Sequence, residues 1–475
     1  MSIDPQNLKQ FVESEFTQKA LPDLQKFISI PNQSPAYDPD WQKNKTLLTA
    51  ASQLRQYAEM VSGVQGLSAI LSSDEDKTPF LLITIEATAS DNKTIMFYGH
   101  YDKQPPLEGW GDGLGPYTPV VRDGYLYGRG AADDGYSTYA ALTMIRSLQY
   151  FKVPHPKFVI IVEGSEESGS IDLPFYLDEY QQFIGAPDLI ISMDSGTLDY
   201  DRIWLTSSLR GLVSFDLNVD TLTKGIHSGK GSGVAPESFM ILRKLISRIE
   251  NYNDKSITIK NFEVDISDDV RSTAEKTYAL IKDKWLSYFP LLPGVNLLGE
   301  NSVDLYLSNN WKPSLIVMGE SGIPAIKDAG NVLRPYTHTK ISIRTPPTYE
   351  TVKNAKQTIL DILTKDPPFN SSVTCTNFEV SDGIVIPKPS DQLSNALNSV
   401  CKNYLKNDYA EFYGGFSIPF TAIIGYYFPN SPFIVTGAAG PDSNPHGLNE
   451  KLNLSYTKNF ICTFTHVLAN YKQFV

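Results

Sequence analysis

Cysteine is scarce in this chain of 475 residues, which has only Cys375, Cys401 and Cys462 and no CxxC spacing. An odd number of isolated cysteines excludes a disulfide framework and a zinc ribbon, and it favours a reducing compartment. The chain also has no uninterrupted apolar run near the ~18 residues of a membrane span, and no basic stretch followed by an apolar one at its N-terminus. We therefore expect a soluble, cytoplasmic protein.

Basic residues are fewer than acidic residues. Lys and Arg number 41 against 53 Asp and Glu, which gives a net charge of −12, and no block of like charges occurs. Nucleic acids and anionic membranes attract basic surfaces, so we expect neither as a partner. The length is about three times that of a typical ~150-residue domain, and it predicts two or three domains with full hydrophobic cores.

Hydrophobic periodicity predicts an α/β fold for the first part of the chain, residues 1–207. Short apolar runs rich in β-branched residues predict strands buried on both faces at 93–99, 157–164 and 188–193. Helical periodicity is found over residues 8–29, 44–61 and 137–150. The order strand, helix, strand is typical of a central, mostly parallel sheet flanked by helices.

The pattern restarts near residue 208. A strand (210–219), a helix (235–250), further strands, a second helix (348–363) and a last strand (372–380) predict a separate α+β, ferredoxin-like domain over 208–383. Residues 384–475 again alternate helix and strand, and the run FIVTG (433–437) is a candidate to rejoin the first sheet. The inserted domain therefore interrupts a catalytic domain built from 1–207 and 384–475.

Polar side chains follow the predicted strands, at the edge where open α/β sheets bind ligands. They are His100 with Asp102, Asp133 with Asp134, Glu166 with Glu167, Asp194, and His446 in a late turn. Each site alone has an ordinary explanation, such as a helix N-cap, a solvated strand end or an exposed loop histidine. Together they offer the imidazole and carboxylate ligands that suit two divalent ions.

The same motifs carry a resemblance to a known family. GHxD, YGRGxxDD, EGxEESGS, the Asp after a strand, HSG, SIR and NEKLN occur in that order along nearly the whole chain. In this set the chain resembles the dinuclear zinc peptidases that include carnosinases, cytosolic nonspecific dipeptidase, aminoacylase and bacterial glutamate carboxypeptidase. The branch it resembles most is that of the cytosolic dipeptidases and carnosinases.

The resemblance implies a role for each residue of the cluster. Asp133 bridges two divalent ions, Zn²⁺ in first place and Mn²⁺ as the alternative, and a cis peptide bond follows it. One ion is completed by His100 and Asp194, and the other by Glu167 and His446. Glu166 is the general base, and Asp102 orients His100.

The inserted domain is expected to act as a lid and dimerisation domain. By the resemblance, His227, Asn331 and Arg344 polarise the substrate carbonyl or hold its carboxylate, and Ser417 is a further substrate contact. The resemblance also implies that His227 reaches the site of the partner in a homodimer. A capping histidine in a glycine turn is the ordinary alternative for His227. The chain departs from its relatives at Gly135, where a Lys is usual, and at Phe416, which separates Ser417 from the preceding glycines.

We therefore predict a metal-dependent dipeptidase that acts on short peptides with a free C-terminal carboxylate. An amidohydrolase of N-acyl amino acids is the alternative within enzymes, because it uses the same metals and base. A catalytically silent, peptide-binding relative is a third hypothesis. The presence of every expected ligand and of the base disfavours it.

Overall fold

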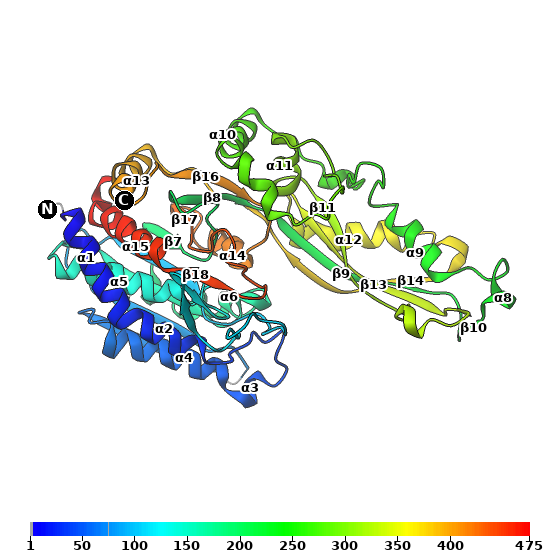
Figure 1. Ribbon diagram of the computed structural model, residues 1–475, viewed down its shortest axis with the longest axis horizontal. Helices are drawn as coiled ribbons and strands as arrows, with labels where there is room; N and C mark the ends of the chain where they lie inside the picture. Colours follow the sequence, from blue (N-terminus) through cyan, green and yellow to red (C-terminus); the bar gives the residue numbers. More distant parts are fainter. Residues whose placement is uncertain (1–2, 75) are drawn as a thin grey trace. The chain divides into compact units, whose positions relative to one another are not determined.

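The computed structural model describes residues 3–74 and 76–475, and the chain forms two compact units (Figure 1). The first unit comprises Met1–Ser207, Ile386–Phe412 and Ile423–Val475. The second comprises Ser208–Val385 and Tyr413–Ala422. The segment Tyr413–Ala422 thus packs with the second unit, whereas the sequence analysis assigned all of 384–475 to the first.

A six-stranded mixed sheet of order β1-β2-β6-β3-β7-β17 forms the centre of the first unit. Its strands are β1 (Leu67–Ser72), β2 (Phe80–Ile85), β3 (Thr94–His100), β6 (Lys157–Glu163), β7 (Leu189–Ser192) and β17 (Phe433–Val435). β6, β3, β7 and β17 pair in parallel, whereas β2 runs antiparallel to both of its neighbours. The predicted mostly parallel sheet is confirmed, including the return of the chain after residue 384 as β17.

Helices cover this sheet and carry most of the remaining core. They are α1 (Pro5–Glu15), the π-helical turn η1 (Phe16–Ala20), α2 (Leu21–Ile28), α3 (Trp41–Asn44), α4 (Thr46–Gln56), the π-helical turn η2 (Tyr57–Val61), α5 (Tyr136–Tyr150), α6 (Leu173–Glu179), α7 (Gln181–Ile184), α13 (Asp391–Tyr404) and α15 (Leu454–Ala469). The boundary between the units falls within α14 (Pro419–Tyr427), after Ala422. α15 packs against α1, α5 and α13, so the two ends of the chain share one core. A small antiparallel sheet joins β18 (Lys451–Asn453), β5 (Tyr125–Tyr127) and β4 (Val120–Arg122).

The second unit is built on a four-stranded antiparallel sheet of order β11-β13-β9-β14. Its main elements are β9 (Gly211–Asp220), α9 (Ser238–Ile246), β11 (Ser314–Ser321), β13 (Tyr336–Thr345), α12 (Thr351–Leu363) and β14 (Ser372–Ser381). Both helices pack on the sheet around a core of their own, so the predicted ferredoxin-like order of strand, helix, two strands, helix and strand is confirmed.

Shorter elements complete the chain. These are β8 (Trp204–Leu209), β10 (Ile226–His227), α8 (Ser228–Gly231), α10 (Asp268–Trp285), α11 (Val303–Asn310), β12 (Val332–Leu333), β15 (Ile384–Val385) and β16 (Ala410–Gly414). β10 pairs with β12, and β15, β8 and β16 form a three-stranded sheet. No helix within residues 3–74 and 76–475 is long and apolar enough to cross a membrane.

Candidate functional site

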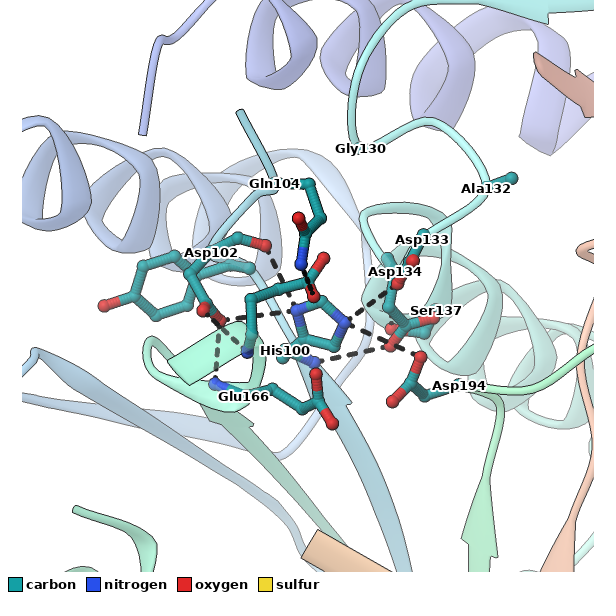
Figure 2. Close-up of polar contacts among 12 residues, drawn as sticks. His100, Asp102, Gln104, Gly130, Ala132, Asp133, Asp134, Ser137, Glu166 and Asp194 are labelled. Atoms are coloured by element: carbon teal, nitrogen blue, oxygen red, sulfur yellow. Dashed lines mark hydrogen bonds and ion pairs between the residues drawn. The ribbon is translucent and has the colours of Figure 1, made fainter. Parts of the chain in front are cut away.

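The parallel strands of the first unit bring four polar segments to one edge of its sheet. β3 ends at His100, the short helical turn Glu166–Ser168 follows β6, and Asp194 follows β7 by two residues. Because β6, β3 and β7 are parallel neighbours, these positions meet at the carboxyl edge of the sheet, as Figure 2 shows. Asp133 joins them from the loop that precedes α5.

His100 is fully buried at the centre of this cluster. Its Nε2 lies 3.1 Å from Oδ1 of Asp133 and 3.6 Å from Oδ1 of Asp194. The other ring nitrogen, Nδ1, lies 3.1 Å from the backbone oxygen of Asp102 and 3.3 Å from its Oδ1 (Figure 2). A carboxylate behind the far nitrogen fixes the orientation of a metal-binding imidazole, so His100 presents Nε2 to the two acids.

A second group of ligand atoms shares Asp133 with the first. Nε2 of His446 lies 3.0 Å from Oδ2 of Asp133 and 3.3 Å from Oε2 of Glu167. Two sets of three residues therefore each have their ligand atoms within 4.8 Å of one another: His100, Asp133 and Asp194, and Asp133, Glu167 and His446. Each oxygen of Asp133 faces a different set, and imidazole with carboxylate is a donor set that fits Zn²⁺ or Mn²⁺.

Asp102 connects this cluster to the glutamate turn. Its Oδ1 accepts a hydrogen bond of 3.1 Å from the backbone N–H of Glu166, and its Oδ2 accepts one of 3.0 Å from that of Glu167. The side chain is fully buried. One carboxylate thus orients His100 and holds the turn that carries both glutamates.

Glu166 lies beside the two ligand sets and belongs to neither. Its side chain is buried and extends toward Asp194 (Figure 2), and its carboxylate accepts no hydrogen bond from any other described residue. Burial, and then the charge of Asp194, raise the pKa of Glu166 well above its ordinary value of 4.5. An uncommitted carboxylate of raised proton affinity is suited to general acid–base chemistry.

The whole cluster has an excess of negative charge. Burial, and then the neighbouring Asp133, raise the pKa of Glu167 to about 8. Burial also raises the pKa of Asp194 to about 6, against the favourable charge of His100. The pKa of His446 rises to about 9 because the acids around it outweigh the effect of burial. Asp133 is the exception, because against the effect of burial its contacts with His100 and His446 hold its pKa well below the ordinary range. The other acids of the two ligand sets and both histidines favour their protonated forms, and bound divalent cations would compensate the same negative charge.

Three residues of the site were missed by the sequence analysis. Gln104 donates a hydrogen bond of 2.6 Å from Nε2 to Oε2 of Glu167. Arg129 and Glu450 form a buried ion pair with a separation of 2.9 Å beside Asp133. Arg129 and Glu450 lie within the motifs YGRGxxDD and NEKLN, and Gln104 lies two residues after GHxD, but none of the three is a histidine or an acid at the end of a strand.

Two features of the Asp133 loop relate to the family pattern. The peptide bond between Asp133 and Asp134 is cis, as the resemblance implied. Gly135 packs so closely that an added Cβ would lie 2.3 Å from the backbone oxygen of Gly130 and 2.5 Å from Cε1 of Phe27. The residue that replaces the usual Lys is therefore fixed as glycine by its surroundings.

In the second unit, the structure brings two of the predicted substrate residues together. Nη1 of Arg344 on β13 donates a hydrogen bond of 2.7 Å to Oγ of Ser417. The Ser417 hydroxyl in turn donates to the backbone oxygen of Arg210, and the Arg210 guanidinium holds the carbonyl of Gly415 at 2.8 Å. Burial, and then the charge of Arg344, lower the pKa of Arg210 to about 9. Two guanidinium groups thus lie close together and form an environment that favours an anion.

His227 and Asn331 form a different pair in the same unit. They are adjacent because β10 pairs with β12, and the N–H of Ser228 donates to the carbonyl of Asn331 at 2.9 Å. Nδ1 of the exposed His227 accepts a hydrogen bond of 3.1 Å from the N–H of Gly229. This contact caps the short helix α8, as expected for a capping histidine in a glycine turn. Its Nε2 has no hydrogen-bond partner among the described residues.

These two pairs lie at opposite ends of one strand ladder. β9 and β13 pair over ten residues, from Asp220 with Tyr336 to Gly211 with Thr345. Arg344 lies next to the end formed by Gly211 and Thr345. Asn331 and β12 shortly precede the opposite end, which is formed by Asp220 and Tyr336. At about 3.4 Å per residue the ladder is roughly 30 Å long. The structure therefore does not bring His227 and Asn331 to Arg344 and Ser417 within one copy of the unit.

Comparisons with known proteins agree with this arrangement. The profile of "Peptidase family M20/M25/M40" matches residues 96–470. The chain is 28% identical over 384 residues to the cysteinylglycine-S-conjugate dipeptidase of Corynebacterium striatum, which covers 78% of this chain and 80% of that protein. It is 27% identical over 408 residues to the Cys-Gly metallodipeptidase DUG1 of Saccharomyces cerevisiae, covering 82% of this chain and 81% of that one.

Among solved structures, human carnosine dipeptidase 1 superposes with a TM-score of 0.77 at 19% identity, covering 99% of this chain and 100% of that one. That likeness extends the agreement in fold to nearly the full length of both chains. The family profile covers well over half of the sequence, and it contains the cluster of His100, Asp133, Glu167, Asp194 and His446. The chain belongs to the peptidase family M20/M25/M40.

Proposed function

We propose that this protein is a metal-dependent dipeptidase that hydrolyses the peptide bond of dipeptides or very short peptides with a free C-terminal carboxylate. The observation that carries the proposal is the position of Asp133, which faces one ligand set with each oxygen while Glu166 lies beside both. Relatives that match over most of the chain are named as dipeptidases or metallodipeptidases.

In this proposal two divalent ions, Zn²⁺ in first place or Mn²⁺, are held by the cluster. His100, Asp133 and Asp194 would hold one ion, and Asp133, Glu167 and His446 would hold the other. When bound, such a pair lowers the pKa of water and polarises the scissile carbonyl. Asp102 keeps His100 and the glutamate turn in position for this ligand set.

Glu166 is the proposed general base. Its carboxylate takes a proton from the attacking water and delivers that proton to the nitrogen of the leaving amine. Support comes from its place next to the ligands, its burial, and the absence of a competing hydrogen bond to its carboxylate among the described residues. A carboxylate that is already hydrogen-bonded or bound to metal would have less freedom to carry the proton.

The second unit is proposed to bind the substrate and to form a homodimer. Arg344 and Ser417 hold the substrate carboxylate, because a guanidinium fork matches its two oxygens. A dipeptide spans only about 7 Å, far less than the ladder that separates Arg344 from His227. We therefore assign His227 and Asn331 to the substrate in the partner's site.

The proposal also includes the roles of residues 208–383 as a lid and as a dimerisation domain. It includes a cytoplasmic location, which fits the presence of three free thiols.

The test is a substrate panel assayed on metal-free and reconstituted enzyme. The protein is stripped by prolonged chelation, reloaded with Zn²⁺ or Mn²⁺, and assayed with dipeptides, C-terminally amidated dipeptides and N-acetyl amino acids. The proposal expects no hydrolysis after stripping and preferential hydrolysis of free dipeptides after reloading. Preferential hydrolysis of N-acetyl amino acids would favour the amidohydrolase instead, and chelator-resistant hydrolysis would overturn the metal-dependent mechanism.

A further inference from the structure

We propose that the buried ion pair of Arg129 and Glu450 is the positioning element that sets the spacing of the two ligand sets. It joins three loops that carry proposed ligands: the segment after His100, the loop of Asp133, and the turn of His446. This inference rests on the proposed metal centre. It concerns residues that bind neither metal nor substrate in the mechanism above.

Glu450 organises the Asp133 loop with both of its carboxylate oxygens. Oε1 accepts hydrogen bonds from the backbone N–H groups of Ala132 at 3.0 Å and Asp133 at 3.2 Å. Oε2 accepts from the N–H of Gly130 at 3.0 Å and from Nη1 of Arg129 at 2.9 Å. Four donors therefore converge on one side chain that is completely buried.

Arg129 extends the same network to the other two loops. Its Nη2 donates to the carbonyl of Gly447, the residue after His446, at 2.8 Å. Its Nε donates to the carbonyl of Pro105 at 3.2 Å, in the segment that also carries His100 and Gln104. All three nitrogens of the guanidinium are thus used: Nη1 and Nη2 bond Glu450 and Gly447 in the segment after His446, and Nε bonds the segment after His100.

The small sheet explains why these groups meet. β18 begins at Lys451, directly after Glu450, and it pairs with β5, which ends two residues before Arg129. The backbone continues this pairing, because the N–H of Gly128 donates to the carbonyl of Glu450 at 3.0 Å. The ladder brings the two segments together, and the ion pair then fixes the loops beyond its end.

Charge explains why an ion pair suits this role better than an acid alone. Glu450 lies next to a cluster of buried acids, and an uncompensated carboxylate there would add to their repulsion. Arg129 neutralises it while the two oxygens keep accepting from backbone groups. The pair therefore fixes the position of Asp133 without changing the net charge around the proposed ions.

The decisive measurement is Zn²⁺ affinity of the full-length protein, obtained by titration against a competing chelator. In Glu450→Gln the amide nitrogen must face two N–H donors, so half of the network is lost while the volume is kept. We expect Zn²⁺ binding to weaken by roughly 10–100-fold, as for other residues that orient metal ligands. Arg129→Lys, which keeps the charge and loses the three-way fork, should weaken it in the same direction.

A matched control separates positioning from stability. Asp23→Asn alters another buried acid of the first unit, one that accepts from Gln53 and Tyr139 and touches no ligand loop. It should lower the Tm of the metal-free protein and leave Zn²⁺ affinity within about twofold of wild type. Glu450→Gln should in addition reduce the rise in Tm that Zn²⁺ produces, because the stabilisation by a ligand grows with the logarithm of its affinity.

The outcomes distinguish this inference from the proposed function. If the wild-type protein binds no Zn²⁺ or Mn²⁺, the metal centre itself is wrong and both proposals fall. If it binds two ions and both variants bind them as tightly as Asp23→Asn does, only the positioning role is overturned. If Glu450→Gln does not fold, Arg129→Lys decides the question, since unchanged affinity in that variant also overturns the inference.

Discussion

The two units differ in how their sheets arrange polar residues: the first brings them together, and the second holds them apart. In the first unit, neighbouring parallel strands end at the same edge, so that His100, Glu166 and Asp194 meet although they are far apart in sequence. In the second unit, the antiparallel ladder of β9 and β13 separates Arg344 and Ser417 from His227 and Asn331 by roughly 30 Å. A parallel sheet concentrates groups into one site, whereas an antiparallel sheet presents two separate ends.

The two regions also differ in charge. The cluster in the first unit is acidic, and burial raises the pKa of Glu166, Glu167 and Asp194. The cluster in the second unit is basic: burial and then the charge of Arg344 lower the pKa of Arg210, and burial lowers the pKa of Arg344. We therefore expect substitutions in the first unit to act on turnover and on metal binding, and those in the second to act on KM for a substrate carboxylate.

The largest expected effect is on turnover. Glu166→Gln keeps the shape of the side chain but cannot accept a proton, so kcat should fall by ~10² or more. The fold and the metal content should stay as in wild type, which is checked by circular dichroism and by metal analysis of the same samples. Near-normal turnover in a fully metal-loaded variant would sink the assignment of the base.

The second expected effect is on substrate affinity. Arg344→Lys keeps the positive charge but loses the bidentate fork, so KM for a free dipeptide should rise by ~10-fold or more while kcat changes less. The matched control is the substrate: with C-terminally amidated dipeptides, wild type and variant should perform alike. An unchanged preference for the free carboxylate over the amide would contradict this role of Arg344.

The third prediction tests the separation of the two ends of the second unit. His227→Ala and Glu166→Gln should each be nearly inactive alone, but mixed dimers contain one site in which both groups are intact. With random exchange of subunits, half of the dimers are mixed, so activity should recover to about a quarter of wild type. Failure to recover in a sample shown to contain mixed dimers would place His227 in the site of its own subunit, or outside any site.

The smallest expected effect is on the stability of the first unit, in which Lys103 binds three backbone carbonyls. Nζ of the buried Lys103 donates to the carbonyls of Phe27, Ile28 and Ile30 at the C-terminal end of α2, at 3.0, 3.2 and 2.8 Å. Burial lowers the pKa of Lys103 well below its ordinary value, and the three carbonyls remain its hydrogen-bond acceptors. Lys103→Met should lower the free energy of unfolding by about 3 kcal/mol, because these carbonyls lose their shared donor.

Denaturant titration checks this value. The control is Lys26→Met, because Lys26 lies on α2 itself and its side chain is 68% exposed. This substitution should change the free energy of unfolding by less than about 0.5 kcal/mol. Equal effects of the two substitutions would show that burial of the cation is not what matters.

Much of the fold was predictable because its strongest signals are local. Continuous apolar runs fixed β3, β6 and β7 to within one or two residues, and the polar residues after them were the right place to look for a site. The helix predicted over 8–29 is interrupted by the π-helical turn Phe16–Ala20. It lies just before Pro22, whose missing N–H breaks the regular hydrogen-bond pattern, and periodicity alone does not register that change.

The parts that escaped prediction depend on contacts between distant residues. Arg129 and Glu450 are 321 positions apart, and a buried ion pair has no local signature in either segment. The return of Tyr413–Ala422 to the second unit is another such case, since its sequence reads as ordinary strand and helix. The two-residue strands β10 and β12, which join His227 to Asn331, are too short to produce a pattern.

The position of His446 has a consequence for how the protein is made. The cluster draws on residues 100–194 and then on His446, so 446 − 194 = 252 residues must be synthesised between its last two ligands. At about 5–20 residues per second, a ribosome needs roughly 10–50 s for that interval. During this time β17 is also missing from the sheet, so a nascent or prematurely terminated chain has an incomplete ligand set. Under the proposed mechanism, a fragment without the C-terminal part would lack His446 and could not complete the second ligand set.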